Sequence, residues 1–238
     1  MKLNIISTFV LALLLTVFFN ACSDDQPTSP IQQDGTTLEK AGLDKPMMIC
    51  SSGTDHGYFW SLCYDGGSAS ISFPNAGTYP GNFAITYSNV SYVFGGKGWS
   101  TGAARTIGYH VGYLSGSYNF VGIHGWVTNP LIEYYIAEMG SVTGGTFVNS
   151  VYSDGHSYSF YKQLRVNAPS IIGTATFWQY KDTWGGSSTG SNCAVTMSNH
   201  VNNWSNYGGQ GFGSSYNYQK LVLEASGSGS INATVWSQ

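Results

Sequence analysis

From Met47 to Gln238 the chain is a series of short segments in which apolar and polar residues alternate. Alternation with a period of two places successive side chains on opposite faces of a strand, so the pattern predicts strands. Gly, Ser and Asn residues separate the segments, as in the turns of an antiparallel β-sandwich. The expected strands, about twelve in number, cover 57–66, 68–73, 83–88, 91–94, 106–114, 117–127, 131–138, 144–152, 157–166, 175–180, 216–224 and 230–236.

A single helix is expected at 198–206. Val201 and Trp204 would share one of its faces, Ser198 can cap its first turn, and Gly208 can end it. One short helix among so many strands indicates an all-β domain of two antiparallel sheets.

Three turns organise the strands. The Asp65-Gly66 pair predicts a hairpin turn that pairs 68–73 with the preceding strand. The Gly-rich stretch 95–99 is predicted as a turn. Pro169 and Gly173 in 168–174 predict the tip of a protruding hairpin.

The N-terminal segment has the pattern of an export signal. Residues 1–21 contain one Lys and a central apolar run that is too short for a comfortable membrane span. Ala21 before Cys22 resembles a bacterial lipoprotein cleavage site, so we expect a lipidated Cys22, with plain secretion as the alternative. We expect a signal peptide (1–21), a disordered tether (22–46) and one folded domain (47–238) in an exported protein, at the cell surface or outer membrane or else secreted.

Charge and cysteine usage exclude several classes of function. The net charge of −3 and the absence of a basic cluster give no case for nucleic acid. In an oxidising compartment Cys50 and Cys63, which bracket a predicted hairpin, can form a disulfide, and this leaves Cys193 as the odd thiol. No Cys-x-x-Cys pair or His/Cys cluster indicates zinc, so no metal or cofactor is expected.

The acidic residues after Met47 are few, and only Glu133 and Glu224 lie within strong strands. Glu138 is expected to be solvated at a strand end. Two carboxyls that face each other across a sugar-sized cleft are the arrangement for glycoside hydrolysis, although a lone strand Glu is more often turned to solvent. Four acids are expected in turns: Asp55, Asp65, Asp154 and Asp182.

The ordered motifs of the domain resemble glycoside hydrolase family 11, the endo-1,4-β-xylanases, over 55–235. The resemblance implies a two-sheet antiparallel β-jelly roll with a thumb hairpin and a long glycan cleft. It also implies hydrolysis of internal β-1,4 bonds of xylan with retained configuration. The matching stretches are 57–61 (GYFWS), 95–99 (GGKGW), 105–107 (RTI), 125–126 (GW), 129–135 (NPLIEYY), 165–171 (RVNAPSI), 173–177 (GTATF) and 199–204 (NHVNNW).

Carried over residue by residue, the resemblance implies that Glu133 is the nucleophile and that Glu224 is the acid/base. Such a pair needs the nucleophile ionised and the acid protonated, so we expect tyrosines such as Tyr135 to keep the pKa of Glu133 low and the charge of Glu133 to raise the pKa of Glu224. The other implied cleft residues are Tyr135 and Tyr218, which would bond the nucleophile or the sugar, the thumb residues Arg165 and Pro169, and the substrate-binding Gln179.

Three cleft positions depart from the family pattern. Cys63 stands where the family usually has a Trp that stacks on a distal sugar, a loss worth about 1–3 kcal/mol by analogy with base stacking. Tyr92 stands where an Asn or Asp contacts the acid/base, and His124 replaces a Tyr that precedes Gly-Trp.

These departures leave two alternatives to a xylanase. One is a xylan-binding protein on the same scaffold with weakened catalysis, which would need neither Glu133 nor Glu224. The other is a hydrolase of a decorated xylan or another β-1,4-glycan. The expected partner is xylan or a related polysaccharide, bound by a monomer whose only membrane contact is a possible anchor at Cys22.

Overall fold

The structure, a computed structural model, describes residues 48–142 and 144–238. The expected signal peptide, the tether and the lipidated Cys22 therefore lie outside the described residues. The described part contains twelve strands and one helix: β1 (Ile49–Asp55), β2 (Tyr58–Asp65), β3 (Ser68–Ser72), β4 (Asn82–Trp99), β5 (Thr106–Gly116), β6 (Phe120–Thr128), β7 (Ile132–Gly140), β8 (Thr146–Ser153), β9 (His156–Ser170), β10 (Gly173–Thr183), β11 (Asn192–Thr196), α1 (Met197–Tyr207) and β12 (Ser215–Ser237).

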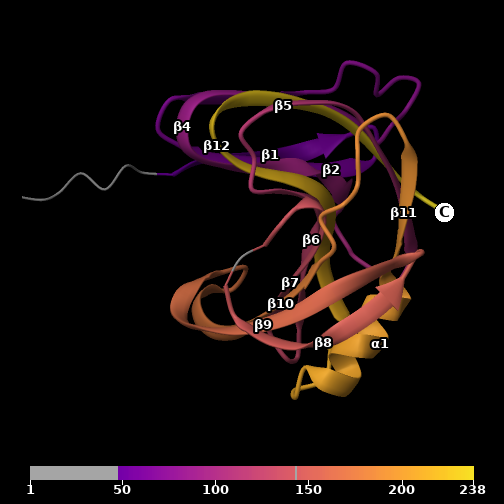
Figure 1. Cartoon of the computed structure of the whole chain (residues 1–238). Coiled ribbons are helices and arrows are strands. Elements are labelled where there is room, and N and C mark those ends of the chain that lie inside the picture. Colours follow the sequence, from indigo (N-terminus) through magenta and orange to yellow (C-terminus); the bar gives the residue numbers. More distant parts are fainter. Residues whose placement is uncertain (1–47, 143) are drawn as a thin grey trace, which may run out of the picture. The chain divides into compact units, whose positions relative to one another are not determined.

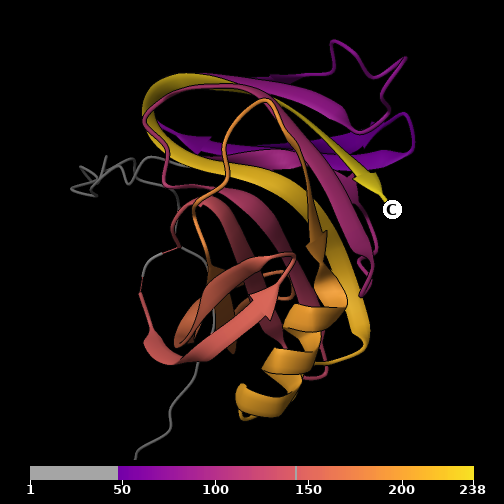
Figure 2. The ribbon, with the colours of Figure 1, turned by 45° about the vertical axis from the view of Figure 1, so that its right-hand side comes forward.

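Two long strands, β4 and β12, pass through both layers of the fold (Figures 1 and 2). Residues 215–224 of β12 pair with β6 and with the end of β4, whereas 227–237 pair with β5 and with the beginning of β4. The first layer has the order β1-β2-β4-β12-β6-β7-β10-β9-β8, and the second the order β3-β4-β12-β5-β11. The pairs are antiparallel except for β7 and β10, which run parallel. The two-sheet jelly roll is thereby confirmed.

The apolar core lies between the two layers. On β7 the alternate residues Tyr134 and Ile136 are fully buried in it, and on β12 Leu221 and Leu223 are buried in the same cluster. Because side chains alternate along a strand, the residues between them face the other side of the first layer. That other side is the face on which Glu133 lies.

The Gly-rich stretch 95–99 is the end of β4 and not a turn. β12 passes so close to it that a Cβ on Gly96 would lie 1.9 Å from the carbonyl oxygen of Leu221. These glycines therefore serve the close approach of two backbones. The expected strands 83–88 and 91–94 also join into the single strand β4.

The strand that follows the Asp65-Gly66 turn does not pair back onto its predecessor. β3 pairs with 84–88 of β4, and β2 pairs with β1 on one side and with 92–98 of β4 on the other. Since both sides of β2 are already taken, β3 joins the second layer.

Two acids are buried within strands instead of lying where they were expected: Glu138 was expected to be solvated, and Asp182 to lie in a turn. Glu138 is 1% exposed and accepts hydrogen bonds from the hydroxyls of Tyr109 (2.7 Å) and Tyr158 (2.8 Å). Asp182 is fully buried, with one carboxyl oxygen 2.6 Å from Nδ1 of His200. Burial raises the pKa of both carboxyls. Tyr109 belongs to β5, so Glu138 faces the core and not the cleft.

The helix and the protruding hairpin are confirmed. α1 begins at Met197 and Gly208 follows its last residue, but Thr196 occupies the N-cap position that was expected for Ser198. β9 and β10 form the hairpin, whose tip lies between Ser170 and Gly173. Among the described residues no helix is long and apolar enough to cross a membrane.

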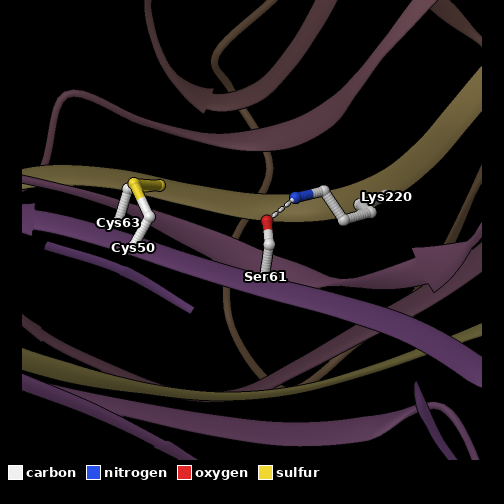
Figure 3. The surroundings of a disulfide bond; sticks show 4 residues. All are labelled: Cys50, Ser61, Cys63 and Lys220. Carbon is white, nitrogen blue, oxygen red and sulfur yellow. Dashed lines mark hydrogen bonds between the residues drawn. A yellow bond between two sulfur atoms is a disulfide. The ribbon is translucent and has the colours of Figure 1, made fainter. Parts of the chain in front are cut away.

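The expected disulfide is present. Cys50 and Cys63 are directly paired across β1 and β2 and are bonded to each other (Figure 3). Cys193 is in no disulfide. The bond closes a loop with a sequence separation of 13.

Replacing both Cys50 and Cys63 by Ser should lower the free energy of unfolding by about 2–3 kcal/mol, because the unfolded chain gains the freedom of an open loop. Urea unfolding followed by circular dichroism measures the loss. Cys193→Ser, which removes a thiol that is in no disulfide, is the control and should leave the midpoint nearly unchanged. Equal midpoints for the double variant and the wild type would contradict the prediction.

Candidate active site

Glu133 is held from both sides by neighbouring strands. Its Oε1 lies 2.9 Å from Nε2 of His124 on β6, and its Oε2 accepts a hydrogen bond from Nε2 of Gln179 on β10 at 2.6 Å. Gln179 is the direct ladder partner of Glu133 across the parallel pair. The residue as a whole is only 9% exposed. The side chain is therefore fixed in the cleft floor.

These contacts decide the charge of Glu133. Burial by itself raises the pKa of Glu133, but the hydrogen bonds from His124, Gln179 and Tyr135 outweigh burial and hold this pKa below its ordinary value. The carboxyl is therefore ionised at neutral pH.

His124 serves this site as a neutral ring. Burial lowers its pKa, and the positive charge of Lys220 adds to the effect against the attraction of Glu133. Nδ1 of His124 is buried without a hydrogen-bond partner among the described residues. A neutral ring with its proton on Nε2 donates to Glu133 and leaves no proton stranded on Nδ1.

Glu224 has the opposite tendency. Burial raises its pKa, and the negative charge of Glu133 raises it further, against a hydrogen bond from Asn119 Nδ2 to Oε1 (3.0 Å) and the positive charge of Lys181. Glu224 therefore keeps its proton to higher pH than an ordinary Glu. Two carboxyls with pKa values shifted apart are the pattern of a nucleophile and a general acid.

The cleft consists of two adjoining cavities that share Tyr135. The Glu133 pocket has a volume of about 450 Å³, and the Glu224 pocket about 480 Å³. The structure brings all the expected cleft residues to these two cavities. Tyr92, His124, Glu133, Tyr135, Pro169 and Tyr218 line the first, and Tyr135, Arg165, Gln179 and Glu224 line the second.

The disulfide lies at the wall of the Glu133 pocket, with Cys63 at the position where the resemblance implies a stacking Trp. Beside it is Lys220, which is 1% exposed and donates a hydrogen bond to Ser61 (Figure 3). The Nζ of Lys220 also lies 4.7 Å from the ring centre of Tyr218. Burial lowers the pKa of Lys220 to about 7. This lysine supports the residues of the cleft wall from within.

Sequence reasoning missed Asn119, Lys181 and Gln163. Asn119 lies between two strands, where Asn is expected for backbone reasons, and nothing in the sequence places it beside Glu224. Lys181 could have been found, because it lies two positions after Gln179 and therefore on the same face of β10. Within 48–142 and 144–238 no group of three or more His, Cys, Asp or Glu side chains is arranged to hold a metal ion.

His124→Phe should raise the pKa of Glu133 by removing a hydrogen-bond donor. Since Glu133 must be ionised to act as the predicted nucleophile, the acid limb of the kcat/KM profile should then move to higher pH. Loss of a hydrogen bond to a charged group predicts a decrease of about tenfold at acidic pH. His124→Gln, which keeps an N–H donor, is the matched control. An acid limb that does not move in the Phe variant would contradict this account of the His124 contact.

Comparison with known proteins places the chain in a family. The sequence model of the family described as "Glycosyl hydrolases family 11" matches residues 55–234 of this chain. Endo-1,4-beta-xylanase 11A from Botryotinia fuckeliana is 35% identical over 213 residues, which cover 87% of this chain and 89% of that protein. The ethylene-inducing xylanase of Penicillium digitatum is 39% identical over 200 residues, covering 81% and 89%.

Two further comparisons define the extent of the match. Ethylene-inducing xylanase 1 of Botryotinia fuckeliana is 39% identical over 68% of this chain, and the match spans only 57% of that longer protein. A solved structure from a comparison of two major endo-1,4-β-xylanases of Trichoderma reesei has a TM-score of 0.63 and 33% identity, and covers 78% of this chain and 98% of that one. The chain therefore belongs to glycosyl hydrolase family 11.

Proposed function

We propose that this protein is a retaining endo-1,4-β-xylanase that hydrolyses internal β-1,4 bonds of xylan by double displacement. The observation that carries the proposal is the pair of cleft carboxyls whose pKa values are shifted in opposite directions, Glu133 downward and Glu224 upward. The named xylanases among its relatives supply the substrate. A pure binding protein would need neither shift.

In the first step the Glu133 carboxylate attacks the anomeric carbon of the sugar above it. The bond from that carbon to the leaving oxygen breaks, and Glu224 gives its proton to this oxygen. The attacked sugar then occupies the Glu133 pocket, and the leaving chain occupies the Glu224 pocket.

In the second step water replaces the leaving chain. Once Glu133 is an ester its negative charge is gone, so the pKa of Glu224 falls and Glu224 can accept a proton from the attacking water. The new bond from water to the anomeric carbon releases Glu133 as a carboxylate. Two inversions leave the configuration retained.

The same charges set the form of the pH profile. Activity should rise with pH as Glu133 ionises, through a pKa below the ordinary value. It should fall as Glu224 loses its proton, through a pKa above the ordinary value. The result is a bell-shaped profile with a broad plateau.

Reducing-sugar release by the purified protein from unsubstituted xylan, arabinoxylan and soluble cellulose tests the proposal. We expect release from xylan, with the first product in the β configuration by proton NMR. Binding of xylan without release would favour the binding-protein alternative, and release mainly from a decorated xylan or from cellulose would favour a different glycan.

For the segment outside the described residues we propose export and a lipid anchor at Cys22. The support is the apolar run followed by Ala21-Cys22. Incorporation of labelled fatty acid should be lost in Cys22→Ser. If the wild type is secreted without the fatty-acid label, the lipid anchor is refuted and secretion without an anchor is the remaining explanation.

A further inference from the structure

The two halves of the cleft differ in charge. Lys181 and Arg165 line the Glu224 pocket, whereas no Lys or Arg lines the Glu133 pocket. The described part of the chain contains only six Lys and Arg residues. Two of them therefore gather in one cavity of about 480 Å³.

The other four cations are engaged elsewhere. Lys97 forms an ion pair with Asp55 at 2.6 Å. The other three donate hydrogen bonds to uncharged groups: Arg105 to the carbonyl of Thr101, Lys162 to the carbonyl of Gly208, and Lys220 to Ser61. None of these four lines either cleft pocket.

The two pocket cations differ in burial but line the same cavity. Lys181 is 4% exposed, and its Nζ donates to Oε1 of Gln163 at 2.7 Å and to the carbonyl of Gly144 at 3.4 Å. Arg165 is exposed on β9, and no carboxylate of the described residues forms an ion pair with it. Burial and the charge of Arg165 lower the pKa of Lys181, against the charges of Glu133 and Glu224, which raise it.

The Glu224 pocket thus holds two basic side chains, Arg165 and Lys181, and a single carboxyl, Glu224, so basic groups outnumber acidic ones on the leaving side. A bare xylan chain is neutral and would gain no charge–charge attraction from these two cations. A carboxylate on the substrate would, because Arg binds a carboxylate through a planar fork of two N–H groups.

We propose that the Glu224 pocket binds an anionic branch of the substrate, namely the carboxylate of a uronic acid attached to a xylose on the leaving side of the cleaved bond. The inference rests on the proposed function, which puts the leaving chain in this pocket. Asn119, Gln163 and Ser141 line the same pocket and offer amide and hydroxyl groups to the hydroxyls of the branch.

Three oligosaccharides with the same xylose backbone test the proposal: one bare, one with a single glucuronic acid branch, and one with that branch reduced to glucose. At low salt the wild type should cleave the acidic compound with a kcat/KM about three- to tenfold above that of its neutral counterpart. The branch should appear on the leaving fragment, and salt should reduce the preference. Equal kcat/KM values for the acidic and neutral branches would overturn the proposal.

Arg165→Gln and Lys181→Gln should each bring the acidic-to-neutral ratio closer to one. Lys162→Gln removes a cation from outside the pocket and should leave the ratio unchanged. If Lys181→Gln does not fold, the exposed Arg165 still gives the test. Equal losses on both branched compounds would show that the cations serve the catalytic carboxyls alone, which overturns the proposal.

The two proposals fail in different ways. No cleavage of any compound by the wild type would refute the hydrolase, and calorimetric binding of the acidic and neutral compounds would then still compare the branches. Cleavage of the bare backbone without an acidic preference would refute the anionic branch site only.

Discussion

Glu133→Gln will abolish the release of reducing sugar from xylan, with a loss in kcat of about 10⁴-fold or more. A neutral amide is a poor nucleophile and cannot form and later release the ester with the anomeric carbon. The fold should persist, because Gln has nearly the same volume and the amide of Gln179 can turn to present its oxygen to the new N–H group. Kinetics on xylan and the thermal midpoint are the measurements.

A second buried carboxyl on the same strand provides the control. Glu138 faces the core and is bonded by Tyr109 and Tyr158. Glu138→Gln should change stability while folded molecules keep their turnover. Incubation with a 2-fluoro-xylobioside that carries a good leaving group should add its mass to the peptide of Glu133 in the wild type. Substantial turnover in Glu133→Gln, or a label on another residue, would reject the nucleophile assignment.

Glu224→Ala should slow xylan hydrolysis by about 10²- to 10⁴-fold, the range for general acid–base catalysis. The loss should be far smaller for the first step on an aryl xylobioside with a good leaving group, because that group departs without protonation. Azide should accelerate the second step in the variant, since an anion needs no base. Equal losses on both substrates would argue that Glu224 is not the acid.

Asn119→Ala is the matched variant for Glu224. It removes the hydrogen bond to Oε1 and leaves the carboxyl in place. Because this bond lowers the pKa of Glu224, its loss should raise that pKa and move the alkaline limb of the profile to higher pH. Activity at the optimum should change far less than in Glu224→Ala.

The strands could be predicted because the alternation of apolar and polar residues indicates directly which face of a strand is buried, as in 131–138 and 216–224. The turn expected at 95–99 shows the limit. Gly residues mark both turns and places where two backbones meet, and only the packing of β12 on β4 separates the two. The pairing of β3 with β4 was missed for a similar reason, since a hairpin turn specifies which strands follow each other and not which edge is free.

The candidate site was accessible through family motifs more than through physical reasoning. Glu133 and Glu224 stood out because they are acids within apolar strands. Glu138 and Asp182 are buried as well. Their burial could not be predicted from the neighbouring sequence, because their partners, such as Tyr109 and His200, are distant in the chain. Asn119 and Lys181 come near the carboxyls only after the four neighbouring strands β12, β6, β7 and β10 have assembled.

The course of β12 has a consequence for how the enzyme loses activity. Glu224 lies just before the irregularity at Ala225–Gly227, where β12 leaves the first layer for the second. Glu133 lies within the first layer between β6 and β10. Partial opening of the second layer on warming would therefore move Glu224, the proposed proton donor, while Glu133, the proposed nucleophile, keeps its position. Heat inactivation should appear earlier with xylan than with activated aryl substrates.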